Sequence, residues 1–164
     1  MPKLAELNAL SAERFIAVVG PVFEHSPWVA ARSCDKRPFA NREDLRKTLC
    51  ATVRTASEEE QLALIRAHPD LAGRAVLTSE SQSEQATGGL ENLTGDEVQL
   101  FEKYNAEYKA RFGFPFVICA RLNKKEVILR AFPERLQQSR EKEIETALAE
   151  IYKIADLRLR DLVQ

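Results

Sequence analysis

The chain has 164 residues, the size of one domain whose core is stable without disulfides or bound metal. Hydrophobic residues make up 45% and charged residues 30%, which is typical of a globular protein. The formal net charge of −1 excludes a general attraction to nucleic acid or to anionic membranes. We therefore expect neither as a partner, and an anionic ligand must meet local positive charges.

The cysteine content predicts a reducing compartment. Cys34, Cys50 and Cys119 are odd in number and lack CxxC spacing, which argues against a disulfide framework and against a zinc site. The first residues contain no signal-peptide core, and no apolar run approaches the length that spans a membrane. We expect a cytoplasmic protein.

The first half of the chain predicts helices separated by short breaks. Asn41 with Asp44 resembles a capping pair, and Ser57 with Glu60 forms a capping box. The expected helices cover residues 11–20, begin near Ser26-Pro27, run from 41 to about 56, and run from 57 to 68.

The second half is also helical, apart from one run. Residues 114–120 are β-like, but the run is short and contains Pro115, so we expect a buried extended segment outside any sheet. The expected helices cover residues 79–88, 94–113, 125–136 and 140–162. The sequence predicts an all-α single domain over residues 1–164, a compact bundle of about seven to nine helices without a sheet.

The last helix carries the clearest apolar stripe. Its positions follow helical spacing and are Ile144, Ala147, Ile151, Ile154, Arg158 and Leu162. An arginine on such a stripe needs a partner, because burying an unpaired charge is very costly. Arg158 is therefore either a ligand-binding cation or half of a buried ion pair, and both interpretations stay open. Guanidinium suits planar carboxylate or ureido groups through paired hydrogen bonds.

The stretch around His68-Pro69 is the first candidate for chemistry. Histidine has an unperturbed pKa near neutrality, which makes it the default residue for proton transfer. Pro69 moves His68 out of the helical conformation, so the imidazole is expected at the end of a helix. A surface or capping histidine is an equally good interpretation. Asp70 is expected to act locally, in a turn or as a cap.

A polar helix follows this stretch. Ser81, Glu84 and Gln85 lie at i, i+3 and i+4, so the three side chains share one helical face. They could orient an imidazole and bind a polar ligand, whereas a solvated surface helix is the plainer interpretation. The irregular backbone at Phe116–Ile118 offers N–H groups that could bind an anion. The side chain of His25 is expected to pack or to lie at the surface, and those of Trp28, Phe114 and Phe116 are expected in the core rather than in a ligand cage.

Common cofactor and nucleophile motifs are absent from the sequence. It has no Walker loop, dinucleotide fingerprint, HExxH or nucleophile elbow, and its two histidines are far apart. A transition-metal site is therefore not expected.

Six segments in a fixed order resemble the 2-oxo-4-hydroxy-4-carboxy-5-ureidoimidazoline (OHCU) decarboxylase family. The resemblance runs from about Leu10 to Val163. The segments are Phe23–Trp28, Arg37–Phe39, Ala67–Ala72, Ser81 with Glu84-Gln85 and Gly89-Leu90, Phe114–Ala120 and Arg158-Leu159.

The resemblance implies a fold, an activity and a set of site residues. The family is all-helical, cofactor-free and usually dimeric, and it decarboxylates an anionic ureidoimidazoline to (S)-allantoin in urate degradation. We therefore expect no cofactor, a small-molecule substrate and a homodimer. Matching the family motif assigns catalysis to His68 and Glu84. The same match assigns substrate binding to Pro69, Ser81, Gln85, Phe116, Val117, Ile118 and Arg158.

These residue types suit the implied reaction. The substrate carboxylate lies next to a ring C=N group, so the substrate supplies its own electron sink. Our hypothesis is that His68 transfers the proton and that Glu84 orients it, because a carboxylate partner raises the pKa of an imidazole. Arg158 and Gln85 would clamp the ring and ureido oxygens, with Ser81 adding a hydrogen bond.

Two other functions remain as alternatives. A non-catalytic helical interaction module would use His68, Glu84 and Arg158 as a buried polar network. A ureide amidohydrolase is the second alternative, although the sequence lacks its nucleophile or metal motif. A nucleic-acid-binding role is the weakest, given the near-zero net charge.

Overall fold

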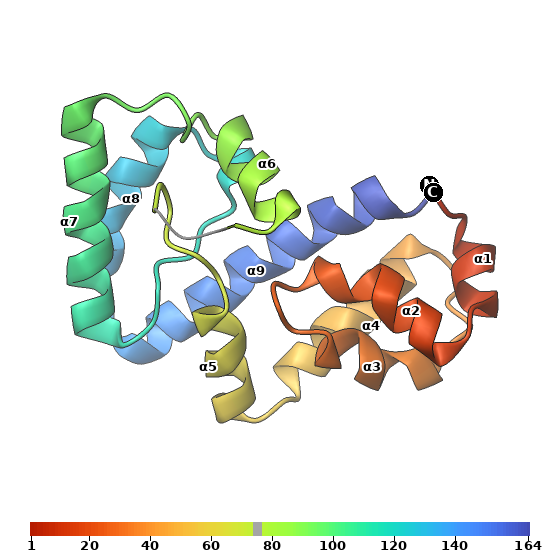
Figure 1. Cartoon of the computed structure of the whole chain (residues 1–164). Helices are drawn as coiled ribbons and strands as arrows, with labels where there is room; N and C mark the ends of the chain where they lie inside the picture. Colours follow the sequence, from red (N-terminus) through yellow and green to blue (C-terminus); the bar gives the residue numbers. More distant parts are fainter. Residues whose placement is uncertain (74–76) are drawn as a thin grey trace. The chain divides into compact units, whose positions relative to one another are not determined.

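The computed structural model describes residues 1–73 and 77–164, and this part of the chain is helical without any strand (Figure 1). The expected all-α class is therefore confirmed. The α-helices of the described residues are α1 (Leu4–Ala9), α2 (Ala12–Val19), α3 (Trp28–Ser33), α4 (Arg42–Arg54), α5 (Glu58–Arg66), α6 (Ser79–Thr87), α7 (Gly95–Phe112), α8 (Lys125–Leu136) and α9 (Arg140–Leu162). Three short 3-10 turns join them: η1 (Gly20–Val22), η2 (Cys34–Lys36) and η3 (Ala120–Leu122).

Side-chain caps begin most of the helices where the sequence predicts. Asn41 accepts a hydrogen bond from the Asp44 N–H at 2.8 Å, and Ser57 forms a complete capping box with Glu60. Thr78 caps α6, and Thr94 caps α7 through its own capping box. Each cap satisfies N–H groups that a helix start leaves without a partner, which explains why these boundaries can be predicted locally.

The sequence analysis does not predict the first helix, α1. The helix α1 has only six residues, too few for a periodic pattern, and its N-cap residue Lys3 provides no side-chain cap. It forms because Leu7, which is fully buried, packs into the core.

The chain divides into two compact units. One contains residues 1–67 and 152–164, called unit 1 here, and the other contains residues 68–151, called unit 2. The division falls within α9.

Unit 1 brings the two ends of the chain together. The Gln164 N–H donates to the Pro2 carbonyl at 3.2 Å, and the marks for both ends coincide in Figure 1. Arg42 donates to the Val163 carbonyl at 3.2 Å. The core of this unit is apolar and includes a stacked pair, Phe15 and Phe39, with ring centroids 6.2 Å apart.

Unit 2 is organised around aromatic rings. Helices α7 and α8 lie side by side (Figure 1), joined by the edge-to-face contact of Phe101 with Phe132. Phe116, from the extended segment, stacks on Phe132 with centroids 3.9 Å apart and meets Tyr108 edge to face. Aromatic pairs of this kind add to the free energy of burial. The predicted buried extended segment at 114–120 is therefore confirmed as part of this core.

A buried polar cluster lies within this aromatic core. The Tyr108 hydroxyl donates to Glu143 Oε1 at 2.5 Å, and Arg135 Nε donates to the same oxygen at 2.7 Å. Glu143 is fully buried, so its charge needs both donors. Burial and the hydrogen bond to Glu143 raise the pKa of Tyr108, which stays protonated at neutral pH.

All three cysteines are buried and free. No helix in the described part of the chain combines the length and apolar character needed to cross a lipid bilayer.

Replacing Tyr108 with Phe is expected to lower the free energy of unfolding by about 1.5–3 kcal/mol, because it removes a donor to a buried carboxylate. Urea unfolding followed by circular dichroism measures this change. Tyr152→Phe, which removes a half-buried hydroxyl in unit 1, is the control and is expected to change the stability less. Equal stability of Tyr108→Phe and the native protein would contradict this account of the cluster.

Candidate functional site

The segment that carries His68 follows α5 directly. Ala67 ends the helix, and Pro69 prevents a further helical turn because its ring fixes φ and lacks an N–H. His68 is 8% exposed, so the surface interpretation of this histidine is wrong. Ala72 adopts a φ of +55°, an uncommon conformation for a residue with a side chain. The structure around this segment therefore holds it in one conformation.

The polar face of α6 is directed inward. Ser81 and Gln85 are buried and Glu84 is half-buried, so the interpretation of α6 as a solvated surface helix is wrong for this face. The Gln85 carboxamide spans the segment after His68. Its Oε1 accepts from the Ala72 N–H at 3.0 Å, and its Nε2 donates to the Asp70 carbonyl at 3.3 Å. Gln85 thus connects α6 by hydrogen bonds to residues 70–72, the segment that follows His68.

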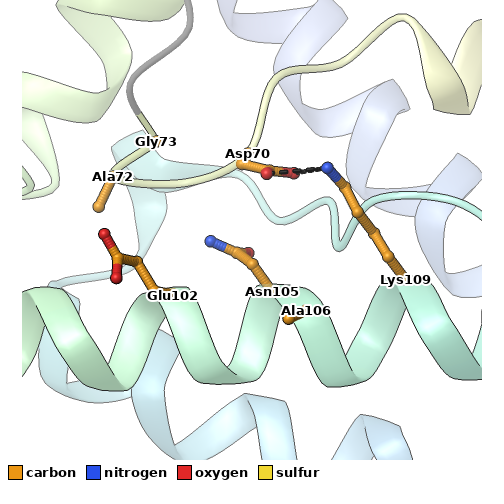
Figure 2. A pocket seen from close by; sticks show the side chains of 7 residues that line it. All are labelled: Asp70, Ala72, Gly73, Glu102, Asn105, Ala106 and Lys109. Atoms are coloured by element: carbon orange, nitrogen blue, oxygen red, sulfur yellow. Dashed lines mark hydrogen bonds and ion pairs between the residues drawn. The ribbon is translucent and has the colours of Figure 1, made fainter.

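Helix α7 holds the same segment from another side (Figure 2). Asn105 donates to the Leu71 carbonyl at 2.9 Å, and the Lys109 ammonium lies 2.7 Å from the Asp70 carboxylate. Asp70 accepts a turn bond from the Gly73 N–H as expected, but its side chain reaches α7 rather than acting locally. The ion pair is half-exposed and contributes little to stability, whereas the Asn105 hydrogen bond is buried.

A cavity of about 310 Å³ lies between this segment and α7 (Figure 2). The residues that line it are Asp70, Ala72, Gly73, Glu102, Asn105, Ala106 and Lys109. Asn105 and Lys109 were not predicted as site residues. Asn105 could have been found, because it follows Phe101 by four positions and precedes Tyr108 by three, which places a polar residue on a buried helical face.

The extended segment offers backbone groups rather than side chains. The Phe116 ring belongs to the aromatic core, and the Arg135 guanidinium lies 4.1 Å from its centroid. Arg135 also donates to the Val117 carbonyl at 2.6 Å. Phe116, Val117 and Ile118 are all buried, and no acceptor for their N–H groups is found within residues 1–73 and 77–164. Buried N–H groups normally have partners, so these three can serve a bound ligand.

The end of α6 lies against the extended segment 114–120. A Cβ atom added to Gly88 would come within 2.9 Å of the Ala120 carbonyl oxygen, so only glycine permits this approach. The Gly88 carbonyl accepts from the Lys125 N–H at 3.2 Å. The polar helix and the segment with the three N–H groups are therefore neighbours within unit 2.

Cys119 is not suited to act as a nucleophile. Burial is the main cause that raises the pKa of its thiol, and the nearby carboxylates of Glu150 and Glu84 raise it further against opposing backbone hydrogen bonds. A thiol with a raised pKa stays protonated near neutral pH.

Arg158 lies in unit 1, whereas the other predicted site residues lie in unit 2. It is 7% exposed and has the partner that its place on the stripe requires. One terminal nitrogen donates to Glu24 Oε2 at 2.7 Å, and the other donates to the Pro21 carbonyl at 2.9 Å. The ion-pair interpretation is therefore confirmed. The substrate-binding interpretation stays a prediction.

No group of three or more metal-ligating side chains occurs in the part of the chain that the structure describes.

Comparison with known proteins places the chain in a family. The family model described as OHCU decarboxylase matches residues 8–160. The chain belongs to the OHCU decarboxylase family. Two archaeal relatives carry the name 2-oxo-4-hydroxy-4-carboxy-5-ureidoimidazoline decarboxylase. The Halalkalicoccus jeotgali protein is 43% identical over 96% of this chain and 89% of its own length. The Haloferax volcanii protein is 40% identical over 96% of this chain and 94% of its own length.

A solved structure of an (S)-allantoin synthase resembles the fold of this OHCU decarboxylase family member. The TM-score is 0.81 at 26% identity, and the match covers the whole of this chain. The chain spans 54% of the length of that synthase chain.

Gln85→Met is expected to release the Ala72 N–H, because this substitution removes the carboxamide oxygen that accepts from it while keeping the side-chain length. Amide hydrogen exchange at Ala72, measured by NMR, should accelerate by about tenfold or more. Gln82→Met is the matched control, since Gln82 is exposed on the same helix. Unchanged protection of Ala72 in Gln85→Met would show that α6 does not hold the segment.

Proposed function

We propose that this protein decarboxylates OHCU to (S)-allantoin. The names of its relatives give the decarboxylation for those proteins, and the structurally similar (S)-allantoin synthase carries the product in its name. The observation that carries the proposal is the double hydrogen bond of Gln85, which joins the polar face of α6 to the segment after His68. The family membership gives this arrangement its substrate.

The proposed reaction requires one bond to break and one proton to be delivered. The bond from the ring carbon to the carboxylate breaks, carbon dioxide leaves, and its electron pair enters the adjacent C=N group. The ring nitrogen of that group, which receives the electron pair, takes up a proton from solvent, and this is the one proton consumed overall. The ring hydroxyl then becomes a carbonyl as its proton leaves, and the neighbouring carbon that bears the ureido group is protonated. The substrate accepts the electrons itself, so the chemistry needs no electron-accepting cofactor.

His68 is the acid–base group in this proposal. It takes the hydroxyl proton and returns a proton to one face of the ring, which sets the configuration of allantoin. Its burial at 8% exposure supports this role, because exclusion of water strengthens proton transfer and limits spontaneous racemic decay. Glu84 would orient the imidazole, and Ser81 would add a hydrogen bond to the substrate.

The backbone N–H groups of Phe116, Val117 and Ile118 would bind the ring and ureido oxygens. This role is supported by their burial without a hydrogen-bond acceptor among the described residues. The Val117 carbonyl, in contrast, already accepts a hydrogen bond from Arg135. Gln85 and Pro69 would shape the same site. Because both ends of the Gln85 carboxamide bind backbone, its main contribution would be to position the histidine segment.

His68→Asn is expected to lower the rate of (S)-allantoin formation by about 10²–10⁴-fold, since it removes the acid–base group. The substrate is generated in situ with uricase and hydroxyisourate hydrolase, and circular dichroism follows the product. His25→Asn is the matched control, because His25 is exposed with a φ of +44° that asparagine tolerates. Near-native turnover in folded His68→Asn protein would exclude the assignment.

Activity is expected to survive exhaustive dialysis against EDTA, because the proposed chemistry uses only protein side chains and the substrate. The initial rate before and after dialysis is the measurement. Loss of activity that returns with a divalent metal would contradict a cofactor-independent reaction.

We also propose that the chain is one domain and acts as a homodimer in the cytoplasm. The free, buried cysteines support a reducing compartment. Light scattering after size-exclusion chromatography distinguishes a dimer from a monomer.

A further inference from the structure

The cavity between residues 70–73 and α7 has no role in the proposed reaction. Its lining residues are distinct from those assigned above to catalysis and to substrate binding. Its volume, about 310 Å³, is at the lower end of the range for small-molecule sites. All of the lining belongs to unit 2. The cavity is therefore a separate candidate site within one compact unit.

One face of α7 forms a wall of this cavity. The α7 positions in the lining are spaced by three, one and three residues, which places them on the same side of the helix: Glu102, Asn105, Ala106 and Lys109. Figure 2 shows that Glu102, Asn105 and Lys109 extend from α7 toward residues 70–73. The polar side chains of this wall thus face the segment that follows His68.

Asn105 leaves one buried acceptor of this wall without a donor. The residue is 7% exposed, and its Nδ2 donates to the Leu71 carbonyl at 2.9 Å. Its Oδ1 has no hydrogen-bond partner within residues 1–73 and 77–164. A buried amide oxygen without a donor is costly, and buried polar groups normally have a partner. A ligand that donates to Asn105 Oδ1 would therefore be stabilised in the cavity.

The donors in the lining, in contrast, already have acceptors. The Lys109 ammonium lies 2.7 Å from the Asp70 carboxylate. The Ala72 N–H donates to Gln85 Oε1 at 3.0 Å, and the Gly73 N–H donates to the Asp70 carbonyl at 3.4 Å. An anion would have to compete with these bonds, whereas the Asp70–Lys109 pair shows that the wall accommodates a cation.

Glu102 provides a second acceptor next to Asn105. The two residues are three positions apart on α7, so their side chains are neighbours. A carboxylate can accept several hydrogen bonds at once, so Glu102 can bind a ligand in addition to its contacts within the protein. Its negative charge favours a cation, while the Lys109 ammonium disfavours a cation close to Asp70. The acceptors and the charges together favour a cation at the Glu102 end of the cavity.

We propose that this cavity binds a small organic cation with N–H donors, of the guanidinium or primary ammonium type. One N–H donates to Asn105 Oδ1 and another donates to the Glu102 carboxylate, while the rest of the ligand contacts Ala106. Ala72 and Gly73 also line the cavity, so the ligand contacts the segment that follows His68. Binding to the native conformation of this segment stabilises it by mass action.

An NMR titration of the isotope-labelled protein with four small probes tests the proposal. Methylguanidinium and methylammonium are cations with N–H donors, urea has donors without a charge, and tetramethylammonium has a charge without a donor. The two donor cations are expected to shift the side-chain amide resonance of Asn105 and to slow hydrogen exchange at the Ala72 N–H. Urea is expected to bind about two- to fivefold more weakly, the range of one exposed ion pair. Tetramethylammonium at the same ionic strength should leave the Asn105 resonance unchanged.

Ala106→Leu blocks the proposed site without removing a polar group. Its larger side chain extends from the same helical face into the cavity, so the affinity for the donor cations is expected to fall about tenfold or more. Ala110→Leu is the matched control, because Ala110 is exposed on α7 outside the lining. Glu102→Gln should weaken binding of the donor cations about two- to fivefold and leave that of urea unchanged. Glu107→Gln, which changes an exposed carboxylate of the same helix, is its control.

Three outcomes would overturn the proposal. Failure of both donor cations to shift the Asn105 resonance would leave the cavity to solvent alone. An equal response to tetramethylammonium would show an effect of salt, and unchanged affinity in folded Ala106→Leu would place the binding elsewhere. If that variant does not fold, Ala106→Met, whose side chain is more flexible, replaces it. None of these measurements uses turnover, so failure of the decarboxylase proposal would not affect them.

Discussion

A buried charge must be paired, and this constraint governs both units of the chain. An isolated guanidinium in an apolar interior would cost several kcal/mol, so each buried arginine requires a carboxylate at hydrogen-bonding distance. In unit 1, Arg158 meets Glu24, and in unit 2, Arg135 meets Glu143. The Arg158–Glu24 pair joins segments 134 positions apart, and the Arg135–Glu143 pair joins the end of α8 to the start of α9. Loss of either carboxylate would leave a buried charge without compensation, so the pairs specify the positions of those segments strongly.

The paired charges also prepare the candidate site. Arg135 donates to the Val117 carbonyl and lies over the Phe116 ring, so the backbone of the extended segment is fixed without using its N–H groups. Gln85 fixes the segment after His68 in the same way, through main-chain atoms. The site is thus assembled from loops that rigid helices hold, which is how precise positioning for catalysis is usually achieved.

Local physics made most of the fold predictable. Capping residues such as Asn41 and Thr94 set helix boundaries within a few residues of their own position, and the last helix follows its apolar stripe. The stripe also showed that Arg158 needs a partner. The sequence could not identify Glu24 as that partner, because the two residues lie 134 positions apart in the chain. Helix α1 was missed because tertiary packing rather than periodicity stabilises six residues.

One measurement tests the central claim that this chain controls proton delivery during decarboxylation. OHCU is generated in deuterium oxide with the protein in excess over substrate, and the allantoin formed is analysed at once by chiral separation and mass spectrometry. The account predicts the (S) enantiomer alone, with one deuterium on the carbon that carries the ureido group. Racemic allantoin, formed at the rate of spontaneous decay, would contradict it.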